Sequence, residues 1–129
     1  MKTVLSALIA LSVIAAIAAP TSADPSDYVF QPVSANVRMG DGSELAVRLI
    51  HKPTGKPVGD VTLFRTRVDM SPDNMVSMTT THTALPSTEP GVYRFRANLT
   101  HMGRWALTVV AKVPGESEPI QGTIVFKAN

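Results

Sequence analysis

The chain has 129 residues, of which 44% are hydrophobic, and it contains no cysteine. That length suits one domain with a single hydrophobic core. The formal net charge of only +2 excludes the strong basic excess typical of nucleic-acid-binding proteins. Without cysteine, disulfide bonds and thiolate nucleophiles or metal ligands are excluded as well.

The N-terminal segment has the pattern of a secretory signal peptide. Lys2 precedes an apolar run from Thr3 to Ala19, and Pro20 with small residues closes that run. A basic start, an apolar centre and a small-residue exit are typical of such signals. We therefore expect residues 1–23 to be removed near Ala23, which leaves an exported protein with no membrane contact. The alternative is an uncleaved anchor, because the run approaches transmembrane length.

The rest of the chain alternates short apolar runs with turn residues, which predicts an all-β fold. Residues 24–43 are expected to form an extended lead-in segment, followed by the main domain at 44–129. The predicted strands are residues 44–51, 61–68, 75–84, 92–99, 104–113 and 120–128. Together with the lead-in, they predict an immunoglobulin-like antiparallel β-sandwich of about seven strands.

Two of these strands show a clear alternation of buried and exposed positions. In 92–99 the predicted inward residues are Tyr93, Phe95, Ala97 and Leu99. In 104–113 they are Trp105, Leu107, Val109 and Val113. Such half-buried strands require a second sheet to cover the apolar face.

The order of the strands also predicts which loops lie together. Consecutive antiparallel strands alternate in direction, so every second loop lies at the same end of a sandwich. The loops at 52–60, 85–90 and 114–119 are expected at one end. The loop at 70–75 and the turn at 100–103 are expected at the other end.

That second end collects the residues with the most distinctive chemistry in the chain. The candidate metal ligands there are Met70, Met75, His101 and Met102, with Asp69 and Met39 in second rank. Thioether sulfur selects Cu(I), and imidazole and carboxylate groups also serve Cu(II). The alternative is structural, because methionine fills gaps in β cores and a Ser-Pro-Asp-Asn turn requires no metal.

Arginine is the second notable residue type. Six arginines lie on the predicted strands, mostly at outward positions: Arg48, Arg65, Arg67, Arg94, Arg96 and Arg104. They either form a docking face for an acidic partner or simply keep strand faces soluble and edges unpaired, and we prefer the second interpretation. No nucleophile elbow, zinc-protease motif or phosphate-binding glycine loop is present, so a non-enzyme is predicted.

The segments HKPTGKPVGDVTLFRTRVDMSPDNM and PGVYRFRANLTHMGRWALTVVAKV resemble the YtkA-like or FixH-like periplasmic proteins of bacteria. The most recognisable positions are Gly91, Tyr93, Leu99, Thr100, Gly103, Trp105 and Leu107. The resemblance implies an immunoglobulin-like fold, a periplasmic location and an association with copper handling, heavy-metal efflux or oxidase assembly. The cleavable N-terminal segment departs from the membrane-anchored FixH type.

The end of the sandwich that collects Met70, Met75, His101 and Met102 is called here the methionine-rich end. Together with this end, the resemblance predicts a periplasmic protein that binds or transfers copper in the manner of a metallochaperone. The expected partner is an efflux adaptor or an oxidase-assembly protein. The alternative is a metal-free accessory domain that docks on an envelope complex of that kind.

Overall fold

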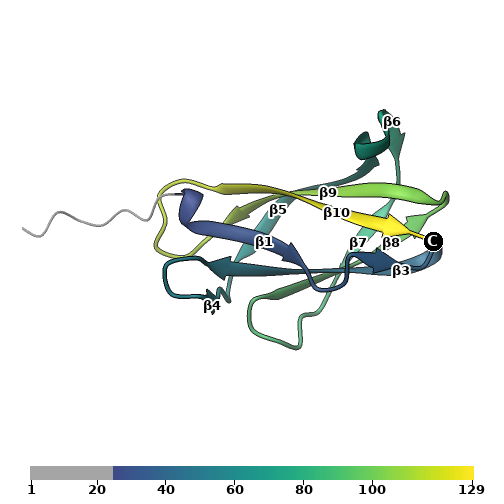
Figure 1. Cartoon of the computed structure of the whole chain (residues 1–129). Coiled ribbons are helices and arrows are strands. Elements are labelled where there is room, and N and C mark those ends of the chain that lie inside the picture. Colours follow the sequence, from purple (N-terminus) through teal and green to yellow (C-terminus); the bar gives the residue numbers. More distant parts are fainter. Residues whose placement is uncertain (1–24) are drawn as a thin grey trace, which may run out of the picture.

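The computed structural model describes residues 25–129, which are almost entirely β-structure (Figure 1). The strands are β1 Tyr28–Pro32, β2 Asn36–Val37, β3 Gly40–His51, β4 Lys56–Pro57, β5 Thr62–Met70, β6 Met75–Thr79, β7 His82–Leu85, β8 Val92–Leu99, β9 Gly103–Lys112 and β10 Ile120–Ala128. Two short 3-10 turns, η1 Pro25–Asp27 and η2 Ser71–Asp73, precede β1 and follow β5. The expected signal peptide, residues 1–23, lies outside the described part. Within that part, no helix has the length and apolarity needed to cross a membrane.

The strands form two sheets that pack face to face. The first, called here the β3–β8 sheet, has the order β1-β3-β8-β7 with β4 added to β3. The second, the β5–β9 sheet, has the order β2-β10-β9-β5-β6. Among the strands of residues 25–129, β2 and β10 alone pair in parallel. The predicted all-β, immunoglobulin-like sandwich is therefore confirmed. Residues 25–129 form ten strands instead of about seven, and the additional ones include β2 and β4, which have only two residues each.

The stretch 75–84 is not the single strand that its sequence predicts. Its first half is β6, which pairs with β5, and its second half is β7, which pairs with β8 in the other sheet. The crossing occurs at two threonines. The Thr80 N–H donates to the Val68 carbonyl in one sheet (3.1 Å), and the Thr81 carbonyl accepts from the Asn98 N–H in the other (3.2 Å). The residues at the crossing are polar, so no apolar face favours continuing the strand in the same sheet.

The segment 24–43, expected as a lead-in, takes part in both sheets over its described residues. β1 pairs with β3 over its full length, from Tyr28 opposite His51 to Pro32 opposite Val47. β2 pairs with the end of β10, where Val37 lies opposite Ala128. The sandwich therefore begins at β1, well before residue 44.

The core lies between the sheets and matches the alternation seen in the sequence. The largest fully buried side chains are Trp105, Phe126, Leu45, Leu49, Met70, Leu99 and Leu107. The expected inward residues of 92–99 and 104–113 are all buried except Tyr93, which is half-buried. Each large apolar side chain removed from water contributes about 1.5–3 kcal/mol, so this cluster supplies the main driving force for folding.

Candidate functional site

The turns at 71–74 and 100–102 meet at one end of the sandwich, as the alternation of strand direction predicts. Asp73 joins them. Its Oδ2 accepts a hydrogen bond from the Arg104 N–H and its Oδ1 accepts one from Arg104 Nε, both at 2.8 Å. Arg104 also donates from Nη2 to the Pro72 carbonyl (2.6 Å). The bonds from Arg104, first the backbone N–H and then the guanidinium, hold the pKa of Asp73 below its ordinary value.

Backbone geometry explains the residue types in these two turns. Asn74 closes η2 in the left-handed region with φ 60°, which asparagine tolerates better than most residues. Gly103 has φ +132°, and a Cβ there would lie 2.5 Å from Asp73 Oδ2 and 2.8 Å from Met70 Cε. A side chain at 103 would therefore push the two turns apart, so their close approach at this end of the sandwich requires glycine.

Two of the predicted metal ligands at this end have structural roles. Met70 is completely buried and belongs to the main core cluster with Trp105 and Leu99. Asp69 is 4% exposed, and its carboxylate accepts from Arg67 Nε (2.6 Å) and the Ser71 N–H (3.0 Å). Burial acts to raise the pKa of Asp69, but the hydrogen bonds from Arg67 and Ser71 outweigh it and lower the pKa.

The other predicted ligands lie at the surface. Met102 is 70% exposed, Met39 43% and Met75 41%. His101 is also exposed, and its Nδ1 lies 2.8 Å from the Thr100 hydroxyl. The buried Trp105 Nε1 donates to the His101 carbonyl (3.0 Å), which fixes the backbone of this turn while its side chains remain in solvent.

This end therefore offers soft and borderline donors from Met75, the first residue of β6, and from His101 and Met102 in the adjoining turn. Met39 adds a fourth. Met39 belongs to the same end because its N–H donates to the Asn129 carbonyl (2.9 Å), next to the pairing of Ala128 with Gly103. Over residues 25–129, histidine and carboxylate groups alone form no cluster of three that could hold a metal. A metal at this end would depend on thioether sulfur.

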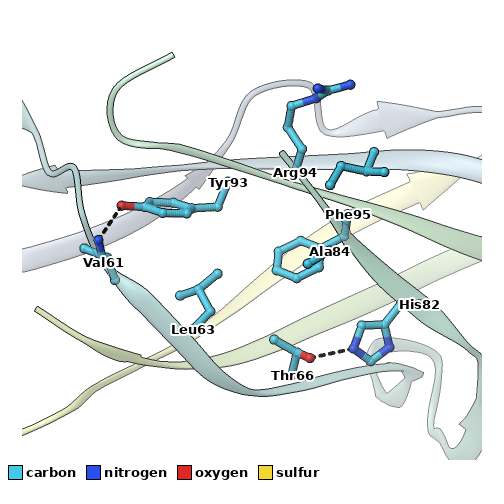
Figure 2. Close-up of a pocket in the computed structure, with 9 residues that line it drawn as sticks. Val61, Leu63, Thr66, His82, Ala84, Tyr93, Arg94 and Phe95 are labelled. Carbon is cyan, nitrogen blue, oxygen red and sulfur yellow. Dashed lines mark hydrogen bonds between the residues drawn. The ribbon is translucent and has the colours of Figure 1, made fainter. Parts of the chain in front are cut away.

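A second site, which the sequence analysis did not predict, is a pocket on the side of the sandwich (Figure 2). This lateral pocket has a volume of about 290 Å³ and opens between β5 of one sheet and β7 and β8 of the other. Its lining residues are Val61, Leu63, Thr66, His82, Ala84, Leu85, Tyr93, Arg94 and Phe95. Most are apolar, and none is a carboxylate.

The polar groups of the lateral pocket are largely occupied. His82 Nε2 and the Thr66 hydroxyl are 2.6 Å apart and join the two sheets, as Figure 2 shows. At the other side, the Tyr93 hydroxyl donates to the Val58 carbonyl (2.8 Å) and accepts from the Val61 N–H (3.2 Å). Burial raises the pKa of Tyr93 against the opposing effect of the Val61 hydrogen bond, so the phenol stays protonated. What remains available is apolar surface.

The six arginines divide into two equal groups. Arg67, Arg94 and Arg104 form ion pairs with Asp69, Glu44 and Asp73. The remaining three, Arg48, Arg65 and Arg96, have no ion pair anywhere in residues 25–129. Ion pairing does not distinguish between the two interpretations of the arginines, so the docking face and the soluble strand face both stay predictions.

Comparison with known proteins gives one family match and several similar solved structures. The family model described as YtkA-like matches residues 22–110, more than half of the chain. The ZirS C-terminal domain is similar in structure, with 12% identity and a TM-score of 0.45 over 100% of this chain and 84% of that chain. The Lin-41 filamin domain has 19% identity and a TM-score of 0.45 over 80% and 92%. No curated protein matches the chain.

Proposed function

The chain belongs to the YtkA-like family, and we propose that it is an exported accessory domain of the bacterial envelope that docks on a partner protein and has no catalytic role. The observation that carries this proposal is a row of arginines on the outer face of the β3–β8 sheet. The FixH-like part of the resemblance, the periplasmic location and the partner classes, an efflux adaptor or an oxidase-assembly protein, belong to the same proposal.

The arginine face consists of Arg48 on β3 and Arg94 and Arg96 on β8. Antiparallel pairing places Arg96 opposite Glu44 and Arg48 opposite Val92, so all three arginines project from the same side of the sheet. Glu44 is ion-paired with Arg94. The hydrogen bond from Arg94 lowers the pKa of Glu44, and the charges of Arg94 and Arg96 lower it further, so one carboxylate faces two arginines, while Arg48 has no ion pair in the described residues. A flat basic surface of this kind favours association with an acidic partner.

The docking function can be tested by photo-cross-linking in intact cells of the native host. A photoreactive residue placed at exposed Gln31, beside Arg48 in the pairing of β1 with β3, should yield a discrete cross-linked product. The variant Arg48→Glu/Arg96→Glu should lose it. The control Lys127→Glu changes a charge on the other sheet and should retain it. A product that survives reversal of both arginines would contradict docking through this face.

Copper binding at the methionine-rich end is a second candidate function. The observation that favours it is the exposure of Met75, at the start of β6, and of His101 and Met102 in the turn that the bonds between Asp73 and Arg104 hold beside it. Exposed thioether and imidazole groups can exchange Cu(I) with a partner one ligand at a time. Buried Met70 and ion-paired Asp69 are already engaged in the fold, so the proposed set is smaller than the one predicted from the sequence.

A Cu(I) competition titration against a colorimetric chelator tests the second candidate. The native chain should bind copper stoichiometrically, and Met75→Leu/His101→Ala/Met102→Leu should lose that binding. Met78→Leu is the matched control, because Met78 packs against the core and should leave copper binding unchanged. Failure of the native chain to compete would rule out copper handling and leave the docking proposal standing.

A further inference from the structure

The β3–β8 sheet ends in a strand with a free edge. β7 pairs with β8 on one side, and within residues 25–129 no strand pairs with its other side. The Thr81 carbonyl bonds to the Asn98 N–H, so residue 81 points its backbone groups toward β8. Because these directions alternate along an antiparallel strand, the N–H and C=O groups of His82 and Ala84 point to the free edge.

This edge carries no charged residue, proline or bulge that would block pairing, and its one protective feature is its length of four residues. Natural edge strands are commonly blunted by charged residues, proline or a bulge. The residues of β7 are His82, Thr83, Ala84 and Leu85, and their pairing with β8 is regular. An uncharged edge with four available backbone groups is suited to pairing with another extended segment.

The lateral pocket lies directly beside this edge. Ala84 and Phe95 are cross-strand partners, and both line the pocket. Figure 2 shows these two side chains between Tyr93 and His82. Ala84 is exposed despite its inward direction, because nothing in the described chain covers it. Side chains of an added strand alternate between the two faces, so those on the inner face would enter the pocket.

The size and chemistry of the pocket indicate its occupant. A volume of 290 Å³ lies just below the range of about 300–1,000 Å³ that is usual for small-molecule sites, and it suits a large side chain. The pocket's hydroxyl and imidazole groups are already hydrogen-bonded, so the side chain should be apolar. Arg94 at the rim and Arg96, two residues along β8, share one carboxylate neighbour, Glu44. The remaining positive charge favours carboxylates on the outer face of the added strand.

We propose that β7 and the lateral pocket form a binding site for an extended segment of a partner protein in which acidic and apolar residues alternate. The segment adds as a further strand beside β7, inserts one apolar side chain between the sheets and presents its carboxylates to the arginine face. This inference rests on the docking function proposed above and states how the partner is held.

Charge argues against a second copy of this chain as the occupant. Pairing of two β7 edges would join two β3–β8 sheets into one surface. The arginine faces of both copies would then lie on that surface, with Glu44 of each copy already paired to Arg94. Like charges gathered on one sheet disfavour such pairing, whereas an acidic segment neutralises them.

The experiment uses the chain expressed with its own N-terminal segment, purified from the envelope fraction and labelled with ¹⁵N. The probe is a blocked peptide, Glu-Val-Glu-Phe-Glu-Val-Glu, titrated by NMR, with a Lys-Val-Lys-Phe-Lys-Val-Lys peptide as the charge control. The acidic peptide should shift the amide signals of His82 and Ala84 most strongly. The basic peptide should produce no saturable shifts.

Two matched variants locate the site. Ala84→Phe fills the pocket from within and should weaken peptide binding by at least about tenfold, as expected when an anchor side chain loses its pocket. Val125→Phe adds the same ring at a 42% exposed position on β10 of the other sheet and should keep the native Kd within about threefold, since it leaves β7 and the anchor pocket unchanged. Circular dichroism confirms that both variants are folded before they are compared.

Several outcomes would overturn the inference: no binding of the acidic peptide, equal binding by Ala84→Phe, shifts centred away from β7, or a concentration-dependent dimer that buries β7. The in-cell cross-linking separates this from the docking function itself. A cross-link that depends on Arg48 and Arg96 but survives Ala84→Phe would remove the strand-addition site and retain the docking domain. Peptide binding at β7, together with a cross-link that persists when Arg48 and Arg96 are reversed, would retain the strand-addition site and contradict docking through the arginine face.

Discussion

The methionine-rich end and the lateral pocket differ in how visible they are in the sequence. The first consists of chemically distinctive residues, namely Met75 at the start of β6 and His101 and Met102 in the turn before β9. The second consists of ordinary apolar residues from β5, β7 and β8. Unusual residue types mark a candidate site in the sequence whether or not they bind a ligand. A pocket made of common residues becomes visible only when the sheets are assembled.

The largest expected effect separates structural from exposed methionines at the same end. Met70→Ala should lower the free energy of unfolding by about 2–5 kcal/mol, because it leaves a cavity beside Trp105. Met102→Ala, at a position that is 70% exposed, should change it by no more than about 0.5 kcal/mol. Urea denaturation followed by tryptophan fluorescence measures both. Equal effects would contradict the division of this end into core and surface thioethers.

Removal of a buried charge gives the next largest effect. Asp69→Asn should destabilise the fold by about 1–3 kcal/mol, since the ion pair with Arg67 and part of the hydrogen bonding to Ser71 are lost. Chemical denaturation at neutral pH measures the change. If Asp69 instead served a metal, the substitution would reduce copper affinity and leave the stability of the metal-free protein unchanged.

The dependence of stability on pH follows from the same carboxylates. Hydrogen bonds lower the pKa of Asp69, Asp73 and Glu44 in the folded state. The unfolded chain therefore binds more protons in mildly acidic solution, and stability should fall as the pH drops from about 5 through the lowered folded values. Denaturation midpoints between pH 7 and 3 measure this. Asp69→Asn should show a shallower decline than the native chain.

The smallest effect concerns the bond that closes the lateral pocket. Thr66→Val removes the hydroxyl that meets His82 Nε2 at 2.6 Å and should cost about 0.5–1.5 kcal/mol. Peptide binding beside β7 should persist, because the backbone groups of His82 and Ala84 are unchanged. Thermal denaturation and the NMR titration check the two parts separately. A loss of binding without a loss of stability would indicate that the hydroxyl itself contacts the ligand.

Local sequence information predicted much of the methionine-rich end. The direction of successive strands placed the turns at 70–75 and 100–103 together, and the structure confirms it through Asp73 and Arg104. The burial of Met70 follows the alternation that begins at Val68. The sequence therefore already favoured a core role for this residue as the alternative to metal binding. The pairing of Asp69 with Arg67 depends on side-chain geometry that alternation does not specify.

The lateral pocket was not predicted because it depends on the change of sheet at Thr80 and Thr81. The polar run around these residues was a signal that one strand ends and another begins, but its β-branched residues favour a continuous strand equally well. Which sheet each half joins is decided by competing long-range pairings with β5 and β8. Such pairings are set by packing in the whole molecule.

The sequence by itself determined the β class, the positions of the main strands and the inward faces of 92–99 and 104–113, because alternation of side chains is a local property of a strand. It also determined the family, since the YtkA-like family model matches residues 22–110. Only the tertiary structure decided that Met70 is core, that half of the arginines are paired, and that β7 has a free edge beside a pocket. Those features depend on contacts between residues far apart in the chain. Such contacts form only when both sheets are assembled, so no local pattern in the sequence specifies them.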